Sequence, residues 1–176
     1  MRILGIDPGY AIIGWGILDY EKSRFSVVDY GAITTPAGMA FPQRLVCIDN
    51  DIRYILEKYK PEALSMEKLC FTNNKTTGID VAQARGVLLL AATQAGLDIH
   101  EYNPIQVKQG VVGYGKAEKK QVMEMTRVIL GLPEVPKPDD TADALALAIC
   151  HAHVRGSTLG SLESNSRRPL KIRKGI

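Results

Sequence analysis

The sequence has few cysteines and no long apolar run, and each shortage argues against a class of protein. Its three cysteines are widely spaced and form no CxxC pair: Cys47, Cys70 and Cys150. An odd, scattered set of this kind argues against a disulfide framework and against a zinc site. No stretch approaches the roughly 20 apolar residues that a membrane span requires, and no early segment has the pattern of a signal peptide. We therefore expect a soluble protein without membrane association that remains in the cytoplasm.

Acidic residues are nearly absent from the end of the chain. Residues 155–176 contain six cations and the single anion Glu163, a net charge of +5, whereas the whole chain carries +3. The remaining body is therefore slightly acidic, and composition alone does not make it a nucleic-acid binder. The Ser, Gly and basic content after residue 154 predicts a flexible tail. With 176 residues and 45% hydrophobic content, we expect one domain, residues 1–154.

Apolar periodicity and turn residues predict five strands and five helices. The expected strands are 2–7, 11–19, 25–33, 63–66 and 98–102, and the expected helices are 42–61, 79–95, a short one after Pro104, 117–130 and 140–153. Strands separated by helices lie parallel in a sheet, so the sequence predicts an α/β fold with a leading antiparallel meander. The helix from Ile79 is apolar all round from Gly86 to Ala92, which predicts cover on more than one side.

Four acidic residues occupy positions where they can converge. Asp7 ends the first strand and Glu67 ends the fourth, so parallel pairing of these strands would bring both carboxylates to one sheet edge. Asp140 and Asp143 are three residues apart at the start of the last helix and share a face. Converging carboxylates repel one another unless cations lie among them, and hard oxygen ligands suit Mg²⁺, with Mn²⁺ as a substitute. Two such ions about 3.5–4 Å apart can drive phosphodiester hydrolysis.

Each acid also has an ordinary structural explanation. Asp7 belongs to an Asp-Pro-Gly turn, and Glu67 can be a solvated charge at a strand end. Asp140 and Asp143 can be acids favoured by the first turn of a helix. No one of these signals decides the function by itself.

Two nucleotide-binding motifs are only approximate. Residues 110–117 nearly match the phosphate loop GxxxxGK[ST], but the last position is Ala117, which has no hydroxyl for magnesium. Gly5-Ile-Asp-Pro-Gly9 resembles the first phosphate loop of actin-like ATPases and sugar kinases, whose two flanking domains do not fit in this length. The histidines make no metal constellation, because His151 and His153 face different sides of a helix.

Together, the motifs resemble those of the RuvC family of Holliday-junction resolvases, from Ile3 to about His153. The motifs that carry the resemblance are Gly5-Ile-Asp-Pro-Gly9, Met66-Glu67, Gln83-Ala-Arg-Gly86, Tyr102-Asn-Pro104 through Val107-Lys108, Ala117-Glu-Lys119, and Lys137 through Ala146. Their order and spacing are highly specific. The resemblance implies a ribonuclease-H-like fold, and it implies catalytic, metal-holding roles for the same four acids, Asp7, Glu67, Asp140 and Asp143.

The resemblance also implies a substrate and partners. It implies a magnesium-dependent homodimer that nicks two opposed strands of a four-way DNA junction in recombination and repair, with the branch-migration proteins RuvA and RuvB as partners. A ribonuclease-H-like nuclease acting on another structured nucleic acid, or a junction-binding module without activity, are the alternatives. The residues that we expect to contact DNA are Lys108, Lys119, Phe71, Asn74 and Arg85. Family members often carry Phe at the position of Cys70 and again after it, whereas this chain has Phe71 alone.

Overall fold

The structure is a computed structural model that describes residues 1–69 and 75–156, without the side chains of residues 75–77. Its elements, in chain order, are β1 (Arg2–Asp7), β2 (Ile12–Glu21), β3 (Arg24–Thr34), α1 (Phe41–Tyr59), β4 (Ala63–Glu67), α2 (Lys75–Gln94), β5 (Asp98–Tyr102), α3 (Pro104–Val112), α4 (Lys119–Leu130) and α5 (Asp139–Gly156). The five strands and five helices predicted from the sequence are all present. The tail predicted for residues 155–176 lies almost entirely outside the described residues, and the domain boundary at residue 154 stays a prediction.

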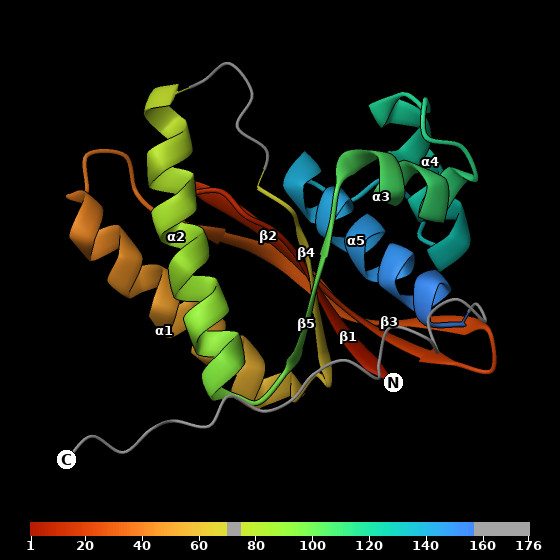
Figure 1. The fold of residues 1–176 in the computed structure, drawn as a ribbon, viewed down its shortest axis with the longest axis horizontal. Helices are drawn as coiled ribbons and strands as arrows, with labels where there is room; N and C mark the ends of the chain where they lie inside the picture. Colours follow the sequence, from red (N-terminus) through yellow and green to blue (C-terminus); the bar gives the residue numbers. More distant parts are fainter. Residues whose placement is uncertain (70–74, 157–176) are drawn as a thin grey trace, which may run out of the picture.

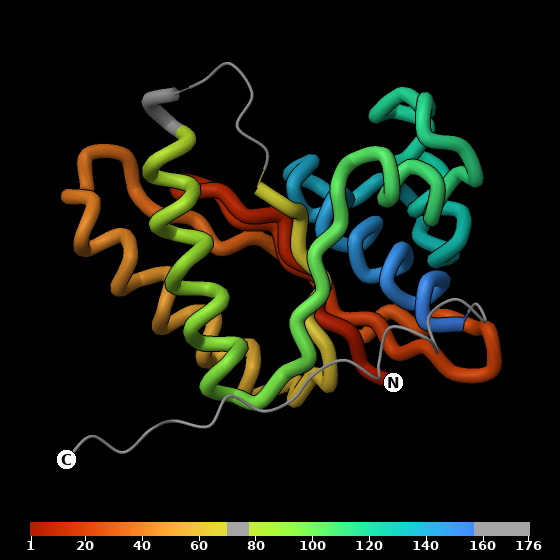
Figure 2. The backbone as a smooth tube through the Cα atoms, viewed as in Figure 1, coloured from red at the N-terminus to blue at the C-terminus, as the bar shows by residue number. Residues whose placement is uncertain are grey.

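A single mixed sheet with strand order β3-β2-β1-β4-β5 forms the centre of the molecule. β1, β2 and β3 pair antiparallel, whereas β1 pairs parallel with β4, and β4 pairs parallel with β5. The predicted combination of an antiparallel meander and parallel strands is therefore confirmed. Helices α1 and α2 lie side by side on one face of the sheet, and α3, α4 and α5 lie on the other (Figures 1 and 2).

Alternation along the strands divides the core between the two faces. Leu4 and Ile6 of β1 are fully buried against α1 and α2. Ile3, on the opposite face of the same strand, belongs to a second core with α4 and α5. Each face of the sheet is thus covered by apolar helices, as expected of a central β1 strand that is buried on both sides.

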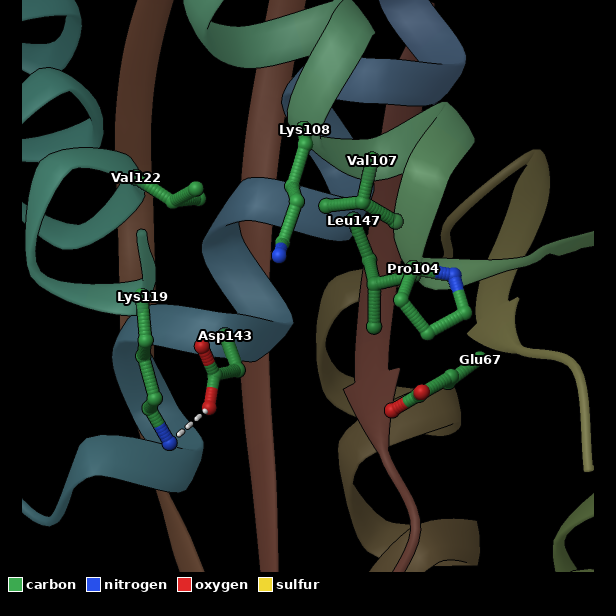
Figure 3. Close-up of a pocket in the computed structure, with 8 residues that line it drawn as sticks. All are labelled: Glu67, Pro104, Val107, Lys108, Lys119, Val122, Asp143 and Leu147. Atoms are coloured by element: carbon green, nitrogen blue, oxygen red, sulfur yellow. Dashed lines mark ion pairs between the residues drawn. The ribbon is translucent and has the colours of Figure 1, made fainter. Parts of the chain in front are cut away.

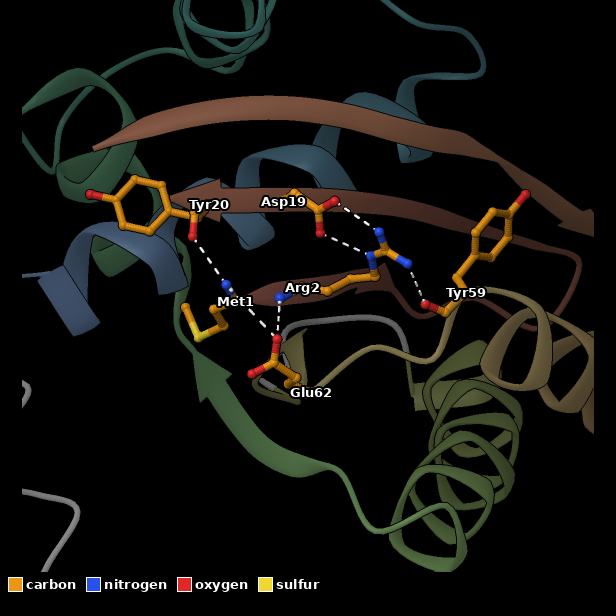
Figure 4. Close-up of polar contacts among 6 residues, drawn as sticks. All are labelled: Met1, Arg2, Asp19, Tyr20, Tyr59 and Glu62. Carbon is orange, nitrogen blue, oxygen red and sulfur yellow. Dashed lines mark hydrogen bonds and ion pairs between the residues drawn. The ribbon is translucent and has the colours of Figure 1, made fainter. Parts of the chain in front are cut away.

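Arg2 joins several elements at the start of β1 (Figure 4). Its Nε and one terminal nitrogen donate to both carboxylate oxygens of Asp19 in β2, each at 2.8 Å. Its other terminal nitrogen donates to the carbonyl of Tyr59 at 2.9 Å, and its main-chain N–H donates to Glu62. A bidentate pair between arginine and a carboxylate is stronger than a single hydrogen bond. These contacts therefore hold the start of β1 against β2 and against the end of α1.

Helix α2 differs from its prediction in both start and cover. It begins at Lys75, four residues before the predicted Ile79. Within one chain the helix is covered on one side only, because Ile79 and Leu90 are 59% and 55% exposed, so cover on a second side stays a prediction. A β-carbon added at Gly86 would meet nothing within 4 Å.

Among the described residues, no helix has both the length and the apolar content that a membrane span requires.

Candidate active site

Asp7 and Glu67 lie next to each other at the ends of two parallel strands. Ile6 of β1 pairs with Met66 of β4, so the two acids that follow are at the same level of the sheet. Both belong to the face that α5 covers, because Gly5 and Ser65, two residues earlier in each strand, contact α5 directly. The predicted convergence of these two acids at one sheet edge is therefore present in the structure.

Helix α5 brings Asp140 to the same edge because it lies directly on glycines of the sheet. Gly14 of β2 pairs with Asp7, and a β-carbon at Gly14 would overlap the main-chain carbonyl of Asp140. Further along the helix, Gly5 allows the same close approach to the main-chain carbonyl of Ala144, and Gly16 makes room for the side chain of Leu145. We call Gly5, Gly14 and Gly16 the glycine groove. The glycine groove was not predicted from the sequence, although glycine inside a strand is a known sign of close backbone approach.

Two buried hydroxyl groups fix the position of α5 on the sheet through hydrogen bonds. Thr141, between the two acids of the helix, donates from Oγ1 to the carbonyl of Gly31 in β3 at 3.1 Å and is fully buried. Ser65 of β4 donates from Oγ to the carbonyl of Leu147 at 2.6 Å. Buried hydroxyls require partners of this kind. These two hydrogen bonds hold the first half of α5 above the ends of β1 and β4.

The pKa values show that the four acids share one electrostatic environment. Burial, followed by the negative charges of the other three acids, raises the pKa of Asp7 to about 7. Burial also raises the pKa of Glu67, with a further contribution from the charge of Asp143. Burial raises the pKa of Asp143 although Lys119 opposes the shift. Like charges held this close disfavour one another's ionised forms, which a cation would reverse.

Two lysines line a pocket of about 200 Å³ together with two of the acids, Glu67 and Asp143 (Figure 3). Its walls are formed by Glu67, Pro104, Val107, Lys108, Lys119, Val122, Asp143 and Leu147. The Nζ atom of Lys119 is 2.7 Å from Oδ2 of Asp143, a direct ion pair. The Lys108 side chain descends from α3 toward the space between Asp143 and Glu67. Anionic and cationic groups therefore line one opening, an arrangement suited to a phosphate held beside a metal ion.

Comparison with known proteins identifies the family. The family model described as crossover junction endodeoxyribonuclease RuvC matches residues 3–151. The chain belongs to the RuvC family. A RuvC from Ruminiclostridium cellulolyticum is 53% identical over 163 residues, which span 92% of this chain and 98% of that protein. A RuvC from Brevibacillus brevis is 56% identical over 155 residues, 88% of this chain and 93% of that one.

A solved RuvC structure shares the fold. The Thermus thermophilus RuvC is 34% identical and superposes with a TM-score of 0.83, covering 89% of this chain and 96% of that chain. The same protein in complex with a Holliday junction substrate gives a TM-score of 0.82 at 31% identity, covering 90% and 98%. The ribonuclease-H-like fold implied by the RuvC motifs is therefore confirmed.

Of the other three residues expected to contact DNA, Arg85 alone lies in the described part of the chain. Arg85 of α2 is 8% exposed and forms an ion pair with Glu101 of β5. Because Tyr102 faces α5, its neighbour Glu101 points to the opposite face, so Arg85 lies on the side of the sheet away from the acids. Phe71 and Asn74 lie outside the described residues. A DNA contact by any of these three stays a prediction.

The acidic side chains expected to bind metal lie in one region but do not, as they stand, form a complete metal site. Within residues 1–69 and 75–156, no three side chains of His, Cys, Asp or Glu converge closely enough, as they stand, to form a metal site. The chemistry of the donor set nevertheless fits Mg²⁺, since it consists of hard carboxylate oxygens. Burial and like charges raise the pKa of Asp7, and a bound cation would lower it.

Proposed function

We propose that this chain is a metal-dependent endonuclease that resolves four-way DNA junctions by paired, symmetric nicks. Membership of the RuvC family supports this function, and a Thermus thermophilus relative has been solved in complex with a Holliday junction substrate. The observation that carries the proposal for the site is the convergence of Asp7 and Glu67, at the ends of β1 and β4, with the two acids of α5, where burial and like charges raise the pKa of Asp7. A group of desolvated carboxylates beside two lysines is explained by cation and phosphate binding.

The residues in the proposed mechanism have separate tasks. Asp7, Glu67, Asp140 and Asp143 would hold Mg²⁺, with two ions per site and Mn²⁺ as a possible replacement. Bound Mg²⁺ supplies an activated water and stabilises the charge on the leaving oxygen. Lys108 and Lys119, which line the same pocket as Glu67 and Asp143, neutralise the scissile phosphate or its neighbours. Thr141 and Ser65 fix α5, so the acids keep their spacing while DNA binds.

The activity is tested with a synthetic four-way junction whose strands are labelled one at a time. With Mg²⁺ we expect nicks at symmetric positions in two opposed strands, and with a chelator we expect binding without nicks. An RNA–DNA hybrid and a structured RNA of the same length serve as competing substrates. Faster cleavage of either would favour the related nuclease activity, and metal-independent binding without turnover would favour a junction-binding module.

We also propose that the protein acts as a homodimer through the outer face of α2. Ile79, Gly86 and Leu90 recur at helical spacing along this face, and both large side chains are more than half exposed. An exposed apolar stripe of this kind is typical of an interface, and Gly86 permits close approach of a second backbone. A two-fold dimer also matches a two-fold substrate. Association with RuvA and RuvB, and a cytoplasmic location, rest on the family resemblance and stay predictions.

Leu90→Glu is expected to convert the dimer to a monomer, because it places a charge in the apolar interface. Light scattering coupled to size-exclusion chromatography should show half the mass of the unmodified chain. Junction cleavage should then lose its paired nicks. Val46→Glu on α1 is the matched control, since Val46 is 59% exposed and lies on a different helix. A dimer that survives Leu90→Glu would remove α2 from the interface.

A further inference from the structure

The acid group contains a cation supplied by the chain itself. Lys119 pairs with Asp143 at 2.7 Å, its side chain is 58% exposed, and the Asp143 side chain is 26% exposed (Figure 3). The lysine therefore reaches from solvent onto one of the proposed metal ligands. A carboxylate oxygen that accepts this ammonium cannot coordinate a metal ion with the same lone pair.

The influence of Lys119 extends beyond its direct partner. Its positive charge lowers the pKa of Asp7 and of Glu67, although burial raises both by more. Through its ion pair with Asp143 the lysine also opposes the upward shift of that pKa. One ammonium thus partly neutralises three acids from three elements. A divalent cation bound to the same acids would be repelled by it.

The position of Lys119 in its helix is unfavourable by local rules. α4 begins at Lys119, and its first turn contains Lys119 and Lys120 but no acidic residue. The positive end of the helix dipole disfavours cations there. A capping box between Glu118 and Gln121 fixes the start of the helix, and Ala117 is buried beside it. The backbone of Lys119 is therefore held in place, while its long side chain is free to exchange partners.

We infer that Lys119 competes with divalent cations for Asp143 and gives up this carboxylate when a DNA phosphate binds its ammonium. The inference rests on the proposed function of the acid site and adds a regulation to it. DNA binding removes Lys119 from the acids, so metal affinity rises when the substrate is present. By linkage, the metal raises the affinity for DNA by the same factor. The free protein therefore binds Mg²⁺ weakly, and the complete site assembles on the substrate.

Binding of Mg²⁺ to the protein alone, measured by calorimetry, tests the competition. We expect Lys119→Met to bind Mg²⁺ about tenfold more tightly than the unmodified chain, the order expected when one nearby positive charge is removed from a half-exposed site. Lys119→Arg retains the charge and is expected to keep the weak affinity. Lys120→Met is the matched control, because it removes the neighbouring lysine of the same helical turn. Circular dichroism verifies that each variant is folded.

The coupling is tested by repeating the measurement with a junction that resists cleavage but keeps a negatively charged phosphate group at each nick position. The junction should tighten Mg²⁺ binding more for the unmodified chain than for Lys119→Met, because only the unmodified chain also loses the competing ammonium. Equal Mg²⁺ affinity of Lys119→Met and Lys120→Met would overturn the inference and leave the proposed function intact. If neither the unmodified chain nor Lys119→Met binds Mg²⁺ in a manner sensitive to Asp7→Asn, the proposed metal site itself fails.

Discussion

Asp7→Asn is expected to abolish nicking of a four-way junction while leaving binding of the junction nearly unchanged. The substitution removes a negative charge from the centre of the acid group but keeps the size of the side chain. We expect the cleavage rate to fall by at least about a thousandfold, roughly 4 kcal/mol of transition-state stabilisation. Binding depends on phosphate contacts elsewhere and should persist. Nicking with labelled strands and a gel-shift assay measure the two effects separately.

Asp7→Asn is expected to stabilise the fold although it abolishes nicking. A loss of catalysis can therefore be distinguished from a loss of folding. The pKa of Asp7 is raised from 3.8 to about 7, so the folded state disfavours the ionised form. This group therefore destabilises the fold increasingly as pH rises from about 4 to 7. In the presence of a chelator, Asp7→Asn should be more stable than the unmodified chain at pH 8 and equally stable near pH 3.

Asp98→Asn provides the control for both measurements, because Asp98 starts β5 at the opposite end of the parallel strands. It should change neither nicking nor the difference in stability. Full nicking by Asp7→Asn would remove this acid from the mechanism. A loss of nicking together with a loss of stability would instead assign Asp7 a structural role.

Gly14→Ala is expected to be the most disruptive small substitution in the sheet. The new methyl group would overlap the main-chain carbonyl of Asp140, which cannot rotate away as a side chain can. We expect a loss of about 3 kcal/mol in the free energy of unfolding, at the upper end of overpacking costs. Nicking should fall as well, because α5 must shift and carries two of the four acids. Urea denaturation and the junction assay measure the two consequences.

Gly31→Ala is the matched control in the neighbouring strand. Its added carbon would lie 3.1 Å from the ring of Trp15, which can yield slightly. The main-chain carbonyl that accepts from Thr141 is kept. A Gly14→Ala protein as stable and as active as Gly31→Ala would show that the contact between α5 and β2 is not essential.

The sequence predicted those parts of the site that depend on local pattern. Asp7 and Glu67 follow short apolar strands, and parallel pairing of such strands aligns their ends. Asp140 and Asp143 share a helical face by spacing alone. Long-range packing could not be predicted in this way. The periodicity of α2 gives no sign of which side stays exposed, and Arg85 turned out to be buried against Glu101. The direct pairing of Lys119 with Asp143 depends on how α4 is placed relative to α5.

The glycine groove has a consequence for how the protein can change over time. On the α1 and α2 face, apolar side chains fill the space, and one can compensate for another of different volume. On the α5 face, Gly5 and Gly14 lie against main-chain carbonyls of α5, so a larger residue at either position has no neighbour that can shrink in return. We therefore expect evolutionary drift to accumulate in the first core and to stop at Gly5 and Gly14 in the second. The spacing of the acids therefore depends on the shape of the backbone, whereas Lys119 reaches them through a long side chain.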